Sequence, residues 1–158
     1  MTVEYVNTYD INNPYQIIPM KRDEFYDEQI EIYKKTGAPT KAVDIIDVIL
    51  FNEAGEFIIQ KRADHKRHNP NLLDKTIGGH VQNGDNPNHT VMVETVQELE
   101  IPSLVVNTHT EFMRTYYILS EYLQSIGLIQ HIDTKIYNME KIFDKEKVVI
   151  ANRVHFYL

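Results

Sequence analysis

Two glutamates in the segment 85–100 have the type and spacing needed to bind a divalent cation. Glu94 and Glu98 are four residues apart, so on a helix they share one face about one turn from each other. Asp85 can add a third carboxylate or, equally, cap the helix, since aspartate is a preferred N-cap residue. Hard cations prefer oxygen ligands, commonly one or two carboxylates together with phosphate oxygens. Two such glutamates on their own can also form a solvated helix face.

A basic segment lies shortly before the acidic one. Residues 61–75 contain five Lys and Arg against two Asp, whereas residues 85–100 contain four acidic residues and no Lys or Arg. This succession suits a site that binds phosphates and a metal ion together, and two solvated surfaces of opposite charge would give the same pattern. The candidate phosphate ligands are Lys61, Arg62 and Lys75.

The composition excludes several classes of protein. The 158 residues form one domain with enough core to fold without cross-links, and the absence of cysteine excludes a disulfide framework, a thiolate zinc site and a cysteine nucleophile. A net charge of −7 argues against binding of nucleic-acid polymers. No apolar run approaches the roughly 20 residues of a membrane helix, and the first residues lack the pattern of a secretory signal. We therefore expect a soluble cytoplasmic protein.

The elements that must position these residues have the order of an α/β or α+β domain. The doublet Gly78-Gly79 interrupts an extended segment, which indicates a bulge or the close approach of another group. On the following helix, Met92, Val96 and Leu99 form an apolar stripe that we expect to face the sheet. The predicted elements are a helix over 21–36, strands over 42–51 and 56–62, a short extended segment over 76–82, helices over 88–100 and 110–124, and a strand over 147–158.

Residues 79–101 resemble the signature of the Nudix hydrolase family, G-x5-E-x7-R-E-U-x-E-E-x-G-U, in which U is an aliphatic residue. The positions that match strictly are Gly79, Glu94, Glu98 and Ile101. The departures are Asp85 and Gln97 in place of glutamates, Val93 in place of the arginine, Thr95 in place of an aliphatic residue and Glu100 in place of the second glycine.

The sequence before the signature extends the resemblance to residues 42–101. The hairpin DVILFNEAGEFIIQKR and the segment HNPNLLDKTIGGHV are similar to the corresponding region in the branch of the family nearest isopentenyl-diphosphate isomerase. The resemblance implies a Nudix fold, a mixed sheet sandwiched between helices, in one domain over 1–158. Residues 1–40 would then be a helical extension and 105–145 an insertion after the signature helix. Family members usually continue beyond the last predicted strand, so we expect a truncated C-terminus or a sheet edge completed in a homodimer.

The resemblance also implies a chemistry. In Nudix hydrolases the carboxylates of the signature helix hold Mg²⁺ or Mn²⁺, the ion binds a diphosphate, and water attacks phosphorus. For this chain it implies that Glu94 and Glu98 are catalytic and that, with Asp85, they bind the metal. His80 resembles a histidine that ligates metal in the isomerases, although a lone histidine is more often structural. The expected substrate-binding residues are Lys61, Arg62, Lys75, Gly79, His80 and Gln97.

Three functions stay open at this point. The one we favour is metal-dependent hydrolysis of a nucleoside diphosphate derivative or another small diphosphate compound, with neither a nucleic-acid polymer nor a membrane as partner. The second is a catalytically weak or inactive nucleotide-binding module, because Val93 cannot organise the glutamates and Gln97 removes a negative charge. The third, isoprenoid diphosphate isomerisation, is disfavoured because those enzymes use a cysteine where this chain has Ile77-Gly78-Gly79.

Overall fold

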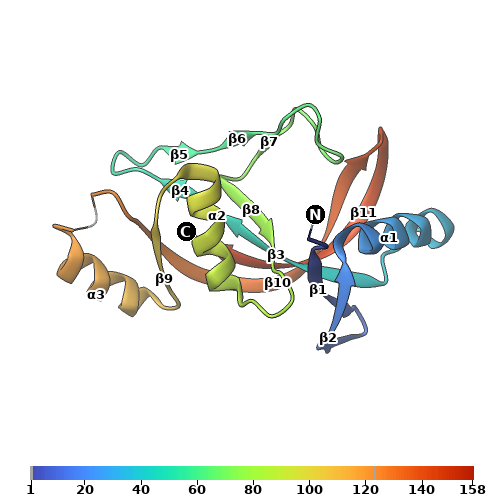
Figure 1. The fold of residues 1–158 in the computed structure, drawn as a ribbon, viewed down its shortest axis with the longest axis horizontal. Helices are drawn as coiled ribbons and strands as arrows, with labels where there is room; N and C mark the ends of the chain where they lie inside the picture. The colour runs from blue at the N-terminus through green and yellow to red at the C-terminus, as the bar shows by residue number, and fades with distance from the viewer. Residues whose placement is uncertain (1, 123) are drawn as a thin grey trace.

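A mixed sheet is the centre of the computed structural model, which describes residues 2–122 and 124–158 (Figure 1). Its strands are β1 (Tyr5–Asp10), β2 (Asn13–Lys21), β3 (Lys41–Val48), β8 (Ile77–His80), β9 (Ser103–Val106), β10 (Gly127–Phe143) and β11 (Glu146–Tyr157). They follow the order β2-β1-β3-β11-β10-β9, and β8 pairs with β3 off this path. Since β11 runs parallel to β3 and antiparallel to β10, it lies in the interior of the sheet.

Two helices cover opposite faces of the sheet. α1 (Arg22–Thr36) packs over a cluster that includes Val43 and Ile45 of β3, and α2 (Pro87–Leu99) over one that includes Ile46 and Val48. Successive side chains of a strand point to opposite faces, so the two clusters lie on opposite sides of β3. This arrangement confirms the mixed α/β (α+β) architecture predicted from the sequence. A third helix, α3 (His109–Leu119), lies beside β9 and β10.

Residues 50–74 form a separate arm beside the sheet. In it, β4 (Leu50–Phe51) pairs with β5 (Phe57–Ile58), and β6 (Gln60–Lys61) pairs with β7 (Leu73–Asp74). The single strand predicted over 56–62 is therefore divided between two pairs. The loop from β6 to β7 is held against the end of β10. There, Asn69 donates its backbone N–H to the Ile142 carbonyl oxygen (3.0 Å), and its side-chain oxygen accepts from the Ile142 N–H (2.9 Å).

The buried face of α2 is not the predicted stripe of Met92, Val96 and Leu99 but is rotated about the helix axis by about one residue. Val91 and Thr95 are fully buried, whereas Met92 is 43% and Val96 50% exposed; Leu99 packs partly against the core. Thr95 can be buried because its hydroxyl donates to the Val91 carbonyl oxygen (2.7 Å) and lies 2.8 Å from the Ser103 hydroxyl oxygen. The predicted apolar stripe was therefore wrong, since hydropathy alone undervalues a threonine whose hydrogen bonds are satisfied.

Two of the predicted subdivisions also need correction. The first 40 residues were expected to be a helical extension, but they contain β1 and β2 of the main sheet as well as α1. Residues 105–145 were expected to be an insertion, but 127–143 form β10, which pairs with β11 over most of its length. Within the described residues, no helix has the length and apolar character needed to cross a membrane.

Candidate active site

A cleft of about 400 Å³ lies between α2, the arm, β8 and the end of β10. Its lining is mostly charged and polar, with glutamates contributed by α2 and cations contributed by the arm and β10. The predicted site residues that line this cleft are Arg62, Lys75, Gly79, His80, Glu94 and Glu98. The predicted site residues that the structure does not bring to it are Asp85, Lys61 and Gln97.

Glu94 reaches the cleft because β8 carries no side chain where the two meet. A Cβ added at Gly79 would lie 3.0 Å from both Cγ and Cδ of Glu94, which is closer than ordinary van der Waals contact. The close approach predicted for the glycine doublet is therefore confirmed. The orientation of α2 about its own axis also directs the glutamates to the cleft, because Glu94 and Glu98 border the buried face formed by Val91 and Thr95. With the predicted stripe buried instead, both glutamates would point to solvent.

The two glutamates are held close together without compensating hydrogen bonds. Burial raises the pKa of Glu94, and the charge of Glu4 raises it further. Burial likewise raises the pKa of Glu98, and repulsion from Glu94 adds to that effect. In the part of the chain that the structure describes, no side-chain hydrogen bond to either carboxylate offsets these shifts. A divalent cation would offset the free-energy cost of burying the two charged carboxylates and the repulsion between them, so the pair is suited to binding such an ion.

These two carboxylates fit Mg²⁺ or Mn²⁺ in the mode in which one or two protein carboxylates share the ion with substrate phosphates. They do not fit a site made of protein ligands alone. Among residues 2–122 and 124–158 there is no group of three or more His, Cys, Asp or Glu side chains arranged to hold a metal. The other oxygens around a bound ion would have to come from substrate and water.

Asp85 does not join the two glutamates. It is exposed in the loop before α2, where its N–H donates to the Gln82 carbonyl oxygen (3.0 Å). The helix is capped instead by Asn86, whose side chain accepts from the His89 N–H (2.9 Å). Asp85 precedes α2, whereas Glu94 is seven residues beyond Pro87, about 10 Å further along the helix axis. Gln97 is exposed on α2 and is not among the residues that line the cleft.

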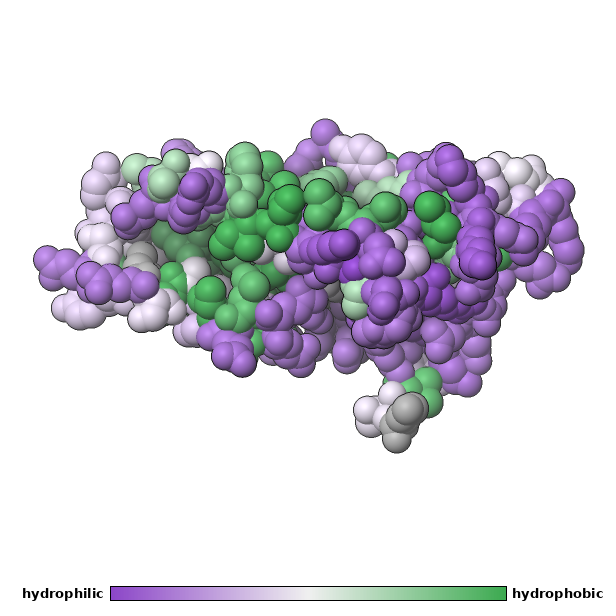
Figure 2. Space-filling model, turned by 90° about the horizontal axis from the view of Figure 1, so that it is seen from above, coloured by the Kyte–Doolittle hydropathy of each residue, from purple (hydrophilic) through white to green (hydrophobic). Residues whose placement is uncertain are grey.

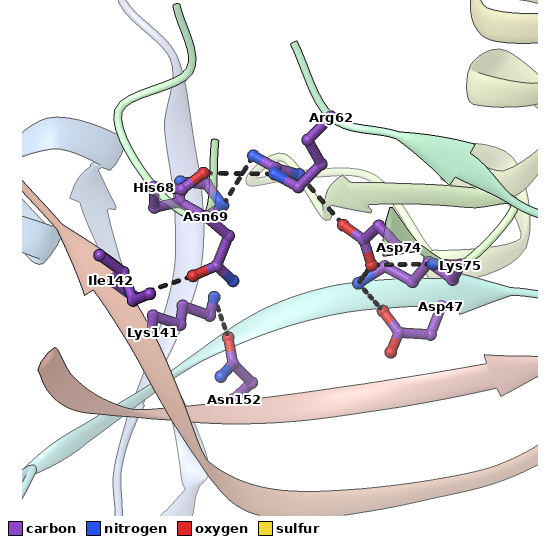
Figure 3. A network of polar contacts seen from close by, with 9 residues as sticks. All are labelled: Asp47, Arg62, His68, Asn69, Asp74, Lys75, Lys141, Ile142 and Asn152. Atoms are coloured by element: carbon purple, nitrogen blue, oxygen red, sulfur yellow. Dashed lines mark hydrogen bonds and ion pairs between the residues drawn. The ribbon is translucent and has the colours of Figure 1, made fainter. Parts of the chain in front are cut away.

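Two cations of the cleft, Arg62 of the arm and Lys75 directly after it, are paired with aspartates (Figure 3). Arg62 Nη1 lies 3.1 Å from Asp74 Oδ2, and Lys75 Nζ lies 2.7 Å from Asp47 Oδ1. Arg62 also donates through Nε to the His68 carbonyl oxygen (3.2 Å). These contacts fix the positions of both cations at the cleft. Neighbouring side chains alternate along a strand, and Lys61, next to Arg62, is exposed to solvent instead.

His80 is held by a protein partner within the cleft. Its Nε2 lies 2.6 Å from the Tyr26 hydroxyl, and burial lowers the pKa of the imidazole well below its usual value, so the ring is neutral. Burial also raises the pKa of the Tyr26 hydroxyl, which keeps its proton. This pairing of α1 with β8 favours the structural interpretation of His80 over metal ligation.

The lining residues that sequence reasoning missed include Glu4, His68 and Lys141. Glu4 precedes β1 and is paired with Arg22 (3.1 Å), at the start of α1. Lys141 lies near the end of β10, far along the chain from the signature helix. No local motif marks these positions, because each is brought to the cleft by strand register and by the folding of the arm. The prediction of a cleft that combines carboxylates and cations did not depend on them.

Comparison with known proteins agrees with this architecture. The NUDIX domain family model matches residues 41–132. An uncharacterized Nudix hydrolase of Listeria innocua is 28% identical over 99 residues, which cover 59% of this chain and 59% of that protein. An uncharacterized Nudix hydrolase of Yersinia pestis is 31% identical over 65 residues, which cover 41% of this chain and 36% of that protein. The matched region thus spans less than two thirds of either relative. Because the family model covers more than half of the chain, this protein belongs to the Nudix family.

Proposed function

We propose that this chain is a metal-dependent hydrolase of a small diphosphate compound, such as a nucleoside diphosphate derivative. The observation that carries the proposal is the composition of one cleft. It combines Glu94 and Glu98, two close carboxylates of raised pKa, with Arg62 and Lys75, two cations fixed by aspartates. A substrate with two linked phosphates can satisfy both groups at once.

Each side of the cleft would have its own task. Glu94 and Glu98 would hold Mg²⁺ or Mn²⁺, and the bound ion would neutralise developing charge and make a water molecule more acidic. Arg62 and Lys75 would bind phosphate oxygens and orient the diphosphate, because their aspartate partners limit the movement of both side chains. The hydrogen bond between Tyr26 and His80 would keep β8, and therefore Gly79, in place below Glu94.

A hydrolysis screen with a matched pair of variants tests this function. Nucleoside diphosphate derivatives and other small diphosphates are incubated with Mg²⁺ or Mn²⁺, and release of phosphate or monophosphate is measured. Glu98→Gln should lower turnover by about a hundredfold or more, because the metal loses one of its two charged ligands. Glu100→Gln removes a charge two residues away, outside the cleft, and should leave turnover unchanged. Equal losses in the two variants would contradict the assigned role of Glu98.

A second candidate function is a nucleotide-binding module with weak turnover. It is favoured by the presence of only two candidate metal carboxylates from α2 in the cleft, where the family signature has more, and by Val93, which offers no charge to organise them. Calorimetry separates the two candidates. Tight binding of Mn²⁺ with a nonhydrolysable nucleoside diphosphate, together with no turnover of any compound in the screen, would favour the module. A homodimer and a cytoplasmic location stay predictions.

A further inference from the structure

Lys141 is a buried cation at the cleft, and within residues 2–122 and 124–158 no carboxylate forms an ion pair with it. It lies on β10 and is 9% exposed. Its ammonium donates to Asn152 Oδ1 (3.3 Å; Figure 3). It also lies 5.6 Å from the centre of the Tyr26 ring. The residues that the NUDIX family model matches end at 132, so Lys141 lies outside the matched region.

Lys141 differs in its partner from Arg62 and Lys75, two other cations of the cleft. Arg62 and Lys75 each have an aspartate, whereas among the described residues the hydrogen-bond acceptor of Lys141 is the neutral amide of Asn152. That amide is oriented for this contact, because its nitrogen donates to the Ile150 carbonyl oxygen (3.1 Å). An ammonium has three donors, so two of them are free for a ligand. A buried charge without a counter-ion is unfavourable, and an anion entering the cleft would relieve this.

The surrounding charges leave one positive charge in excess at this part of the cleft. Three cations, Lys141, Lys75 and Arg62, face two carboxylates, Asp47 and Asp74. Burial, and then the charge of Lys75, lower the pKa of Lys141 to about 8, so the ammonium is mostly protonated near neutral pH. Further groups around it are neutral or paired: Tyr26 and the Arg22–Glu4 pair near α1, His68 on the arm, and His80 on β8.

We propose that Lys141 binds a phosphate oxygen of the substrate and so selects compounds with an anionic group at this position. The inference rests on the proposed function and adds a phosphate subsite on a different element from the glutamates, because Lys141 lies on β10 whereas Glu94 and Glu98 lie on α2. One phosphate would meet the metal at α2, and another would accept the donors that Asn152 leaves free. Removing the ammonium should therefore weaken phosphate binding without affecting the metal.

Binding of inorganic pyrophosphate, measured by calorimetry on the full chain, tests the proposal without requiring turnover. Lys141→Met keeps a long apolar side chain and removes the charge. It should weaken pyrophosphate binding by about tenfold or more, which corresponds to the loss of one charge-assisted hydrogen bond. Affinity for Mn²⁺ alone should not change, and the melting temperature should be equal to or higher than that of the parent. Lys135→Met, an exposed lysine of the same strand paired with Asp133, should leave pyrophosphate binding unchanged.

A second variant tests the same point with the lysine in place. Asn152→Asp would give Lys141 a carboxylate partner within the protein, so it should also weaken pyrophosphate binding while leaving Mn²⁺ affinity unchanged. If Lys141→Met melts at a lower temperature and binds pyrophosphate as tightly as the parent, Lys141 has a structural role and the proposal is wrong. Failure of the parent itself to bind pyrophosphate would also overturn it.

Different results would contradict the phosphate subsite at Lys141 and the proposed hydrolase function. If Lys141→Met and Asn152→Asp weaken pyrophosphate binding but no diphosphate compound is hydrolysed, the phosphate subsite stands and the hydrolase assignment is wrong. If the parent hydrolyses a diphosphate and both variants keep its KM and its pyrophosphate affinity, the hydrolase assignment stands and the subsite is wrong.

Discussion

At the scale of single residues, the position of Glu94, a proposed metal ligand, depends on the absence of a Cβ at residue 79. Gly79 is needed because Glu94 occupies the space in which any other residue would carry its Cβ. The backbone of Gly79 does not require positive φ, so the constraint comes from packing alone. Gly79 therefore controls the position of the Glu94 carboxylate and has little influence on the local backbone.

Gly79→Ala should therefore affect metal binding more than folding. The added methyl group would displace the Glu94 side chain, because it would lie 3.0 Å from two of its carbons. We expect the affinity for Mn²⁺ to fall by about tenfold, with a loss of stability of about 1 kcal/mol from overpacking. Calorimetry and urea unfolding measure the two effects. Gly127→Ala is the control, since its nearest contact would be at an ordinary 3.5 Å; a similar loss of Mn²⁺ affinity there would contradict the packing argument.

The depressed pKa of Lys141 predicts how stability changes with pH. Its pKa is about 8 in the folded protein and 10.5 in its ordinary state, so between these values the unfolded chain binds more protons and stability rises with pH. Below pH 8 both states are protonated, and the full penalty of the buried charge is present. The difference in unfolding free energy between Lys141→Met and the parent should shrink by about 2 kcal/mol from pH 7 to pH 9.5.

Urea unfolding of both proteins at the two pH values measures this change. The tyrosines of raised pKa, such as Tyr9 at about 12, titrate in both proteins and cancel in the difference. A difference that is the same at pH 7 and pH 9.5 would show that the Lys141 ammonium is not held in an unfavourable environment.

At the scale of elements, the arm controls the cationic side of the cleft. Its two short strand pairs give it little sheet of its own, and its loop is fixed to β10 through Asn69. Arg62 depends on this attachment, because its Nε donates to the carbonyl oxygen of His68, the neighbour of Asn69. Phosphate binding by Arg62 should therefore depend on the contact between Asn69 and Ile142, although neither of these residues carries a charge.

Asn69→Ala removes the side-chain acceptor of the Ile142 N–H and should loosen the loop. We expect pyrophosphate binding to weaken by a few-fold, with a stability loss of about 1 kcal/mol for one hydrogen bond, and no change in Mn²⁺ affinity. Asn71→Ala, in the same loop, is the control for a change of side chain alone; both Asn69 and Asn71 have positive φ, so both variants share the same backbone strain. Equal pyrophosphate affinities in the two variants would argue against the attachment.

The sequence predicted the elements well where local signals are strong. Gly37 ends α1 in a left-handed conformation, and the helix over 21–36 and the strand over 147–158 appear within one residue of their predicted bounds. The two glutamates of α2, Arg62 and Lys75 do line one cleft. Local sequence signals failed where contacts with residues distant in the sequence determine whether a side chain is buried or reaches the cleft. Thr95 is buried because Ser103 accepts or donates a hydrogen bond, and Lys141 reaches the cleft only through the pairing of β10.

At the scale of the whole molecule, polar and apolar surfaces are distributed unevenly. The view in Figure 2 shows hydrophobic side chains gathered over the half of the molecule that contains the arm and α2, and more hydrophilic side chains on the other half. Apolar patches of this kind are typical of surfaces that meet a partner or a ligand. The exposed apolar residues of the arm are Phe51, Phe57, Ile58, Ile59, Leu72 and Leu73.

The place of β11 in the sheet has a consequence for how the molecule can be divided. The family match ends at residue 132, yet β11, at 146–157, separates β3 from β10 and pairs with both. A fragment limited to residues 41–132 would lack this strand and most of β10. Its β3 would then have an open edge of unpaired backbone groups, which is a template for aggregation. The segment by which the family is recognised is therefore not an autonomous folding unit, and its boundaries are unsuitable for designing shortened proteins or domain fusions.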